Sequence, residues 1–215
     1  MVELTENEAR KWRAVHSPEA IRRASNFVHN LMGVVIGTAA ALALLHEVGI
    51  LVNILTYLPS ALLTISGAFL TLFLLLHHET KNLKLTLKAV WTDPQQRQHL
   101  TMGVLLTLAG LMEFLKTAKG SSKKILGLVL PSALVVIGFM FLTHPQHGTA
   151  ESIRWSKRYH GVLGSLIALA GVLRAFNILF SILGYLWSGV LLVAALMLAT
   201  YNEPEGSYEE PHVIH

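Results

Sequence analysis

Six long apolar segments, joined by short polar connections, constrain the fold of this chain more than any other feature. They cover roughly residues 26–46, 53–76, 97–117, 124–143, 157–175 and 178–200. A helix needs about 20 largely apolar residues to cross the hydrocarbon core of a bilayer. Only 14% of the 215 residues are charged, whereas about a quarter are charged in soluble domains. The sequence therefore predicts an all-α integral membrane protein, a polytopic bundle of six transmembrane helices.

Three regions follow from this pattern. We expect an amphipathic N-terminal segment over residues 1–25, the transmembrane domain over 26–200 and an acidic tail over 201–215. The tail has four glutamates and no lysine or arginine, so we expect it to lack fixed structure. The last two apolar segments need a break near residues 174–177, because one helix of about 40 residues would be twice the bilayer thickness.

Basic residues predict the orientation. With the N-terminus inside, the inner segments hold twelve lysines and arginines and the outer loops hold five. Positive charge gathers on the cytoplasmic side, so we expect both termini in the cytoplasm of a bacterium, with the chain in its inner or plasma membrane.

Two inner connections carry local signals. In residues 81–91, lysines share one helical face and Leu83, Leu87, Val90 and Trp91 share another, which is typical of a helix lying in the headgroup layer. Asp93-Pro94 and Ser17-Pro18 are predicted to be the N-cap and first residue of helices.

Seven of the eleven histidines lie at the predicted inner face: His29, His77, His78, His99, His144, His147 and His160. Histidine is costly in lipid and is the commonest protein ligand for metals. The ring of histidines therefore indicates a bound metal or haem, and the alternative is a set of interfacial side chains bonded to headgroups and water.

An internal repeat places three of these histidines equivalently. The first, third and fifth apolar segments open with His-x-x-x-Gly, at His29/Gly33, His99/Gly103 and His160/Gly164. Leu-Pro-Ser-Ala-Leu recurs at 58–62 and 130–134. We interpret the bundle as three repeated hairpins that build a shared site. A glycine one turn from the histidine permits either close helix approach or room for a flat macrocycle.

The histidines that end the even-numbered segments are also candidates. His77 and His78 are adjacent, about 100° apart around a helix, so at most one can face a given site. Pro145 disfavours helix at His144, so His144 and His147 could converge in a turn. Metal candidates are therefore His77, His78, His99, His144, His147 and His160. Haem candidates are His29, His78, His99, His144, His147 and His160, with Gly33, Gly103 and Gly164.

Two charges lie near the predicted outer end. Glu113 and Arg174 each follow a repeat histidine by fourteen residues. They could form a buried pair or each reach the outer interface.

The residue types and motifs that the sequence lacks limit the kinds of cofactor and reaction that it could support. With no cysteine, the chain has no disulfide, thiolate metal site, iron–sulfur cluster or c-type haem attachment. Walker, nucleophile-elbow and His-Glu-x-x-His motifs are also absent. Imidazole remains, and it suits haem iron, copper, zinc and nickel.

Histidines on successive helices with glycines one turn away resemble membrane b-type cytochromes of the cytochrome b561 kind. The His-x-x-x-Gly helix starts are similar to those of haem A synthases. The resemblance implies that His99 and His160, with His78 and His144 or His147, are axial ligands of haem b. This chain departs from the b561 pattern because only His46 lies at the outer face.

The leading hypothesis is an electron-transfer protein or oxidoreductase component with bis-His haem b near the cytoplasmic face. Its partners would be the lipid bilayer, a quinone or redox protein, and further copies or subunits of a larger complex, with no nucleic acid. One alternative is a copper-, iron- or zinc-handling protein that uses the same histidines. Another is a non-redox accessory subunit.

Overall fold

The computed structural model describes residues 17–77, 83–119 and 124–209, and all statements of structure below concern these ranges. They form α-helices joined by short connections, with no β-strand in the described ranges. The helices are α2 (Pro18–Glu47), α3 (Leu58–His77), α4 (Leu83–Thr92), α5 (Pro94–Ala118), α6 (Lys124–Leu142), α7 (Ala150–Phe176) and α8 (Leu183–Ala199). A short 3-10 helix, η1 (Asn53–Tyr57), precedes α3.

Several helix boundaries confirm the sequence prediction. Asp93 caps α5 through its side chain, which accepts hydrogen bonds from the backbone N–H groups of residues 95 and 96. Ser17 caps α2 in the same way. The break before the last segment is present, because α7 ends at Phe176 and α8 begins at Leu183. Residues 18–25, expected in a separate N-terminal segment, are continuous with α2.

The protein is a helical membrane bundle, but only part of the six-span prediction is met. In the described ranges, four helical stretches are long and apolar enough to cross a membrane: 18–47, 53–76, 94–118 and 150–176. The apolar stretches of α6 and α8, 126–142 and 183–199, are shorter. At 1.5 Å per residue, the 17 residues of α8 span roughly 25 Å, less than the hydrocarbon thickness of about 30 Å.

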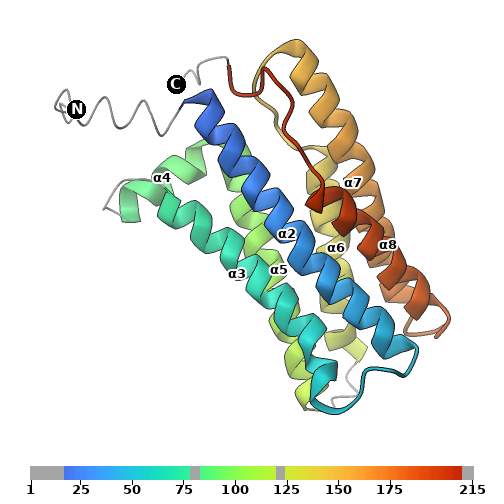
Figure 1. Ribbon diagram of the computed structural model, residues 1–215. Coiled ribbons are helices and arrows are strands. Elements are labelled where there is room, and N and C mark those ends of the chain that lie inside the picture. The colour runs from blue at the N-terminus through green and yellow to red at the C-terminus, as the bar shows by residue number, and fades with distance from the viewer. Residues whose placement is uncertain (1–16, 78–82, 120–123, 210–215) are drawn as a thin grey trace.

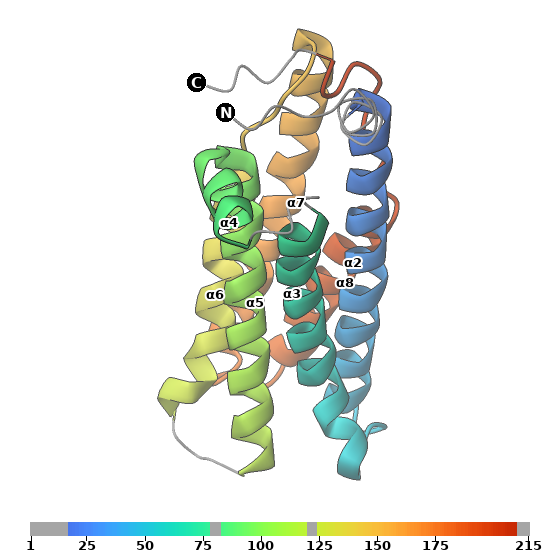
Figure 2. The same ribbon diagram turned by 90° about the vertical axis from the view of Figure 1, so that its left-hand side faces the viewer.

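Six helices form a closed ring in the order α2, α3, α5, α6, α7, α8 and back to α2 (Figure 1 and Figure 2). Neighbours in the ring run in opposite directions. The most extensive contacts join α3 to α5, α6 to α7 and α8 to α2. The helices of each predicted hairpin, α2 and α3, α5 and α6, and α7 and α8, are neighbours in the ring. The most extensive contacts nevertheless lie between hairpins, because each odd-numbered segment packs most closely on the helix before it in the ring.

The glycines of the repeat explain these close pairs. A Cβ atom on Gly103 would lie 2.7 Å from Thr71 Oγ1 on α3, and one on Gly164 would lie 2.5 Å from the Gly138 carbonyl on α6. A Cβ on Gly33 would collide with the backbone of Ala199 on α8. The sequence left two interpretations of the glycine in His-x-x-x-Gly, close helix approach or room for a flat macrocycle. The structure shows close helix approach at all three glycines.

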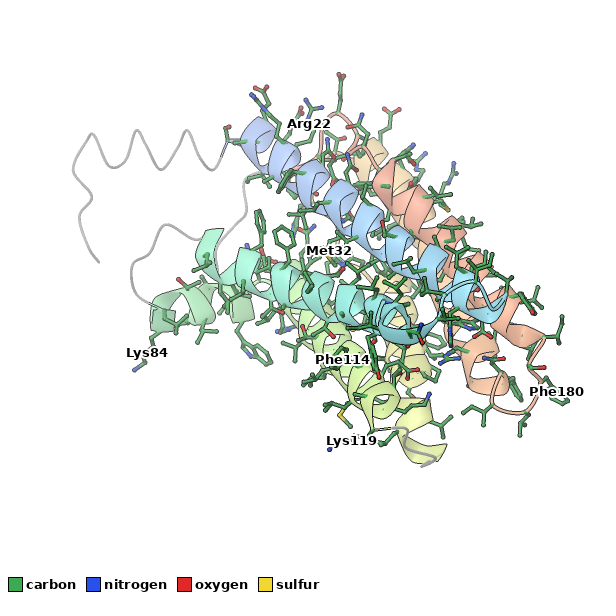
Figure 3. The ribbon with its side chains drawn as sticks, turned by 60° about the horizontal axis from the view of Figure 1, so that its bottom comes forward. Arg22, Met32, Lys84, Phe114, Lys119 and Phe180 are labelled. Carbon is green, nitrogen blue, oxygen red and sulfur yellow. The ribbon has the colours of Figure 1, made fainter. Side chains whose placement is uncertain are left out.

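The fourth helix, α4, lies across the end of the bundle rather than along it (Figure 2). Val90 and Thr86 are buried against the bundle, whereas Leu83, Leu87 and Trp91 are exposed. Lys84 points away from the bundle (Figure 3). Val90 was predicted on the same face as Leu83, Leu87 and Trp91, but it is buried whereas they are exposed. That α4 lies in the headgroup layer stays a prediction.

The expectation of an unstructured tail is wrong for residues 201–209, here termed the C-terminal strap. The strap crosses the end of the bundle beside the start of α7, where Thr149 N donates to the Gly206 carbonyl at 3.0 Å. Tyr208 N donates to the His147 carbonyl at 3.3 Å. Asn26 Nδ2 on α2 donates to Asn202 Oδ1 at 2.8 Å. The acidic composition was misleading because two of the strap's polar side chains, Glu203 and Ser207, are buried in the fold.

Candidate functional site: a cluster of four imidazoles

Four histidines from four separate segments converge at the end of the bundle that the C-terminal strap crosses. His29 lies on α2, His99 on α5 and His160 on α7, while His144 follows the end of α6. The ring centroids of His99 and His144 are 4.6 Å apart, and those of His144 and His160 are 5.1 Å apart. His29 lies 6.0 Å from His99 and 6.1 Å from His160. We call these four side chains the imidazole cluster.

The three repeat histidines make the same hydrogen bond to their own helix. His29 Nδ1 lies 2.7 Å from the carbonyl oxygen of Ser25, His99 Nδ1 lies 3.0 Å from that of residue 95, and His160 Nδ1 lies 2.8 Å from that of Ser156. A carbonyl oxygen only accepts, so Nδ1 carries the proton in each ring. The repeat therefore fixes both the orientation and the tautomer of three imidazoles.

His144 reaches the same state through a side chain. Its Nδ1 lies 2.6 Å from Gln98 Oε1 on α5, which is also an acceptor. Burial, with smaller contributions from the neighbouring histidines, lowers the pKa of His144 well below its ordinary value of 6.5. The ring is therefore neutral and keeps a lone pair on Nε2, the form in which histidine binds metals.

The spacing of the rings can be compared with that of imidazoles on one metal ion. A metal–nitrogen bond is about 2.0 Å, and the ring centroid lies roughly 1.1 Å further on. Two rings on one ion at 90–180° thus have centroids about 4.4–6.2 Å apart. The four measured separations, 4.6–6.1 Å, fall in this range. Several pairs stand edge to face, and no three His, Asp or Glu side chains in the described ranges already surround one point. Binding an ion would require the imidazoles to turn.

Tyr201 completes the cluster and was not a candidate from the sequence. Its ring lies 4.7 Å from that of His29 and 5.5 Å from that of His160. Its phenol oxygen is buried and lies near the side chains of Ser156 and Glu203. No pattern in the sequence located it, because Tyr201 follows the last helix. In the structure the helix contacts align residues 71, 142 and 199, which places Phe73, His144 and Tyr201 at equivalent positions two residues later.

A cavity of about 80 Å³ lies inside the ring of helices next to His29 and His99. Its walls come from all six ring helices and are otherwise apolar, with the thioethers of Met32 and Met102 among them. An engineered cavity of about 150 Å³ holds one benzene molecule. The cavity is therefore too small for a porphyrin unless the helices move apart. Gly33, Gly103 and Gly164 are in contact with neighbouring helices and do not line it.

The other predicted histidines lie elsewhere. His147 Nε2 lies 4.0 Å from the carboxylate of Asp93 at the start of α5. His77 ends α3, but its side chain, and all of His78, lie outside what the structure describes. His46 is exposed at the opposite end of the bundle, where its Nδ1 lies 3.3 Å from the Leu51 carbonyl.

The two outer charges form a pair, as one of the sequence alternatives predicted. Arg174 donates to Glu113 Oε1 at 2.8 Å, and Lys116 donates to the same oxygen at 3.1 Å. The guanidinium also lies 3.9 Å from Glu47, which sequence reasoning missed, and 4.9 Å above the ring of Trp187. This end holds a second cavity, separate from the imidazole cluster. Figure 3 labels Arg22 at the cluster end and Phe114 and Lys119 at this opposite end.

Comparison with protein-family models, curated proteins and solved structures found no match to this chain. The resemblance to cytochrome b561 and to haem A synthases therefore stays a prediction.

Proposed function

We propose that this chain is an integral membrane metalloprotein that holds one copper, iron or zinc ion in the imidazole cluster. The observation that carries the proposal is the common state of the four rings. Each has Nδ1 bonded to an obligate acceptor, and each has a neighbouring ring at a separation compatible with sharing one ion. Metal-binding histidines characteristically donate their second ring nitrogen to such a carbonyl.

The donor set supports a transition metal. Imidazole nitrogen suits zinc, copper and iron, and the nearby thioethers of Met32 and Met102 are soft donors that suit copper. Hard cations such as Ca²⁺ prefer oxygen ligands, of which this cluster offers few.

A b-type cytochrome that passes electrons between a quinone and a redox protein is the second candidate. Two axial imidazoles across one iron have centroids about 6 Å apart, and His29 has this separation from both His99 and His160. The small cavity and the filled glycine positions favour a bare ion over haem.

We further propose that all six ring helices cross the membrane, with both termini in the cytoplasm. The support is the twelve-to-five distribution of basic residues and the packing of α6 and α8 between longer apolar helices. A reporter enzyme fused after His215 should be active only in the cytoplasm, and activity only outside would reverse the orientation.

Metal loading tests the function. Protein purified without metal is incubated with Zn²⁺, Cu²⁺, Fe²⁺ or haem, desalted and analysed for metal content and visible absorbance. We expect about one ion per chain, its loss in His144→Ala and its retention in His46→Ala. A low-spin haem spectrum without bound ion would favour the cytochrome. Binding of neither would leave the accessory-subunit hypothesis.

A further inference from the structure

The C-terminal strap brings one carboxylate to the imidazole cluster. Glu203 is only 4% exposed. Its backbone N–H donates to Asn26 Oδ1 on α2 at 2.7 Å, and its Oε2 accepts a hydrogen bond from the Ser25 hydroxyl at 2.8 Å. Two anchors on one turn of α2 therefore hold this residue in place, Asn26 at its backbone and Ser25 at its carboxylate.

Ser25 connects that carboxylate to a ring of the cluster. The Ser25 hydroxyl oxygen lies 3.2 Å from His29 Nδ1, and the Ser25 carbonyl accepts the shorter bond from the same nitrogen. A carboxylate near the Nδ1–H of a metal-binding histidine orients the ring and makes its Nε2 a stronger donor to the metal. Here the Glu203 carboxylate is connected to His29 through the hydroxyl group of Ser25.

Glu203 forms no ion pair with a positively charged side chain in the described part of the chain. Five ion pairs are present there, and Glu203 is in none of them. A buried carboxylate is costly without a cationic partner. The nearby imidazoles do not supply one when they are neutral. A bound metal cation would balance this charge.

The same carboxylate distinguishes the two candidate occupants. Haem carries its own carboxylate groups, and a buried Glu203 without a basic partner adds a like charge beside them. A metal cation instead gains an attractive interaction in a region of low dielectric constant.

We propose that Glu203 is the charge partner of a divalent transition-metal cation in the imidazole cluster, acting through Ser25 and His29. This inference rests on the proposed function and narrows the ligand to a metal dication. The strap, which sequence composition marked as a free tail, is then part of the site.

The test uses the full-length protein, Zn²⁺ as the probe, and three variants. Glu203→Gln removes the charge but keeps an acceptor for Ser25. Glu205→Gln is the matched control, since Glu205 is exposed on the same strap. Glu203→Asp retains a carboxylate. Zn²⁺ affinity is measured by competition with a chelating dye, and the unfolding midpoint is measured without metal.

We expect Glu203→Gln to weaken Zn²⁺ binding about tenfold or more, Glu205→Gln to change it less than about twofold, and Glu203→Asp to recover part of the affinity. Without metal, the Glu203→Gln midpoint should equal or exceed that of the wild type, because a buried charge has been removed. Unchanged affinity in Glu203→Gln, with wild-type binding intact, would overturn the role of Glu203 alone. Wild-type protein that binds no Zn²⁺, Cu²⁺ or Fe²⁺ would overturn the metal site itself.

Discussion

At the residue scale, the two ends of the bundle handle polar side chains differently. The imidazole cluster holds neutral rings whose protons are fixed by carbonyl acceptors. The opposite end holds charges that neutralise one another, centred on Arg174 and Glu113. The first arrangement keeps lone pairs available for a ligand, whereas the second satisfies the charges internally.

The Arg174–Glu113 pair should show strong coupling. Arg174→Leu leaves Glu113 buried with only Lys116 beside it, and we expect a loss of about 3 kcal/mol of stability. The double variant Arg174→Leu/Glu113→Leu should recover much of this loss, since no uncompensated charge remains. Thermal unfolding in detergent measures the effect, with Lys119→Ala at an exposed position as the control. Additive losses would show that the pair is not energetically coupled.

Individual residues show which parts of the site could be predicted from the sequence and which could not. The convergence of His29, His99 and His160 could be predicted, because a helix period and a repeat place them at one depth. Glu203 and Tyr201 could not, since they follow the last helix and reach the cluster only through the fold of the strap. His147 was predicted together with His144, but Pro145 and Gln146 separate them, and His147 faces the start of α5.

At the element scale, small residues determine which helices pack closely. The repeat is longer than His-x-x-x-Gly, because small or short side chains also recur four and seven residues after each glycine. They are Gly37 and Ala40 on α2, Thr107 and Gly110 on α5, and Ala168 and Gly171 on α7. Most of them lie against the neighbouring antiparallel helix, which agrees with the small-residue interfaces of membrane helices.

Two glycines three residues apart on α7 should respond to alanine with opposite signs. A Cβ on Gly164 would meet the α6 backbone, so Gly164→Ala should lower stability by about 1–3 kcal/mol. In the described part of the chain nothing lies within 4 Å of a Cβ on Gly161, so Gly161→Ala should raise stability by about 0.5–1 kcal/mol through helix propensity. Unfolding midpoints of the two variants make the comparison. A loss of equal size in both would contradict the packing role assigned to Gly164.

Helix existence was predictable, but helix partners were not. Apolar length and capping residues located all six ring helices and α4. The ends of α2 and α7 extend beyond the apolar segments, because polar residues continue a helix into the interface when caps such as Ser17 and Thr149 are available. The most extensive contacts lie between the predicted hairpins, because they follow the positions of glycine and alanine, which hydrophobic periodicity does not report.

At the scale of the whole molecule, the ring closes when α8 returns to α2. This closure brings the strap to the first turns of α2, where Ser25 and Asn26 hold Glu203. Helix α2 and the C-terminal strap thus meet at the imidazole cluster. The strap adds a single carboxylate, that of Glu203, to a cluster built from three repeated units, so the symmetry of the repeat is broken there.

X-ray absorption at the metal edge of the loaded protein tests the central claim most directly, because it reports the ligands of the bound ion. We predict a first shell of nitrogen at about 2.0 Å, with the outer-shell scattering of three or four imidazoles. A first shell dominated by oxygen, or the spectrum of an iron porphyrin, would contradict the proposal that the imidazole cluster holds a bare metal ion.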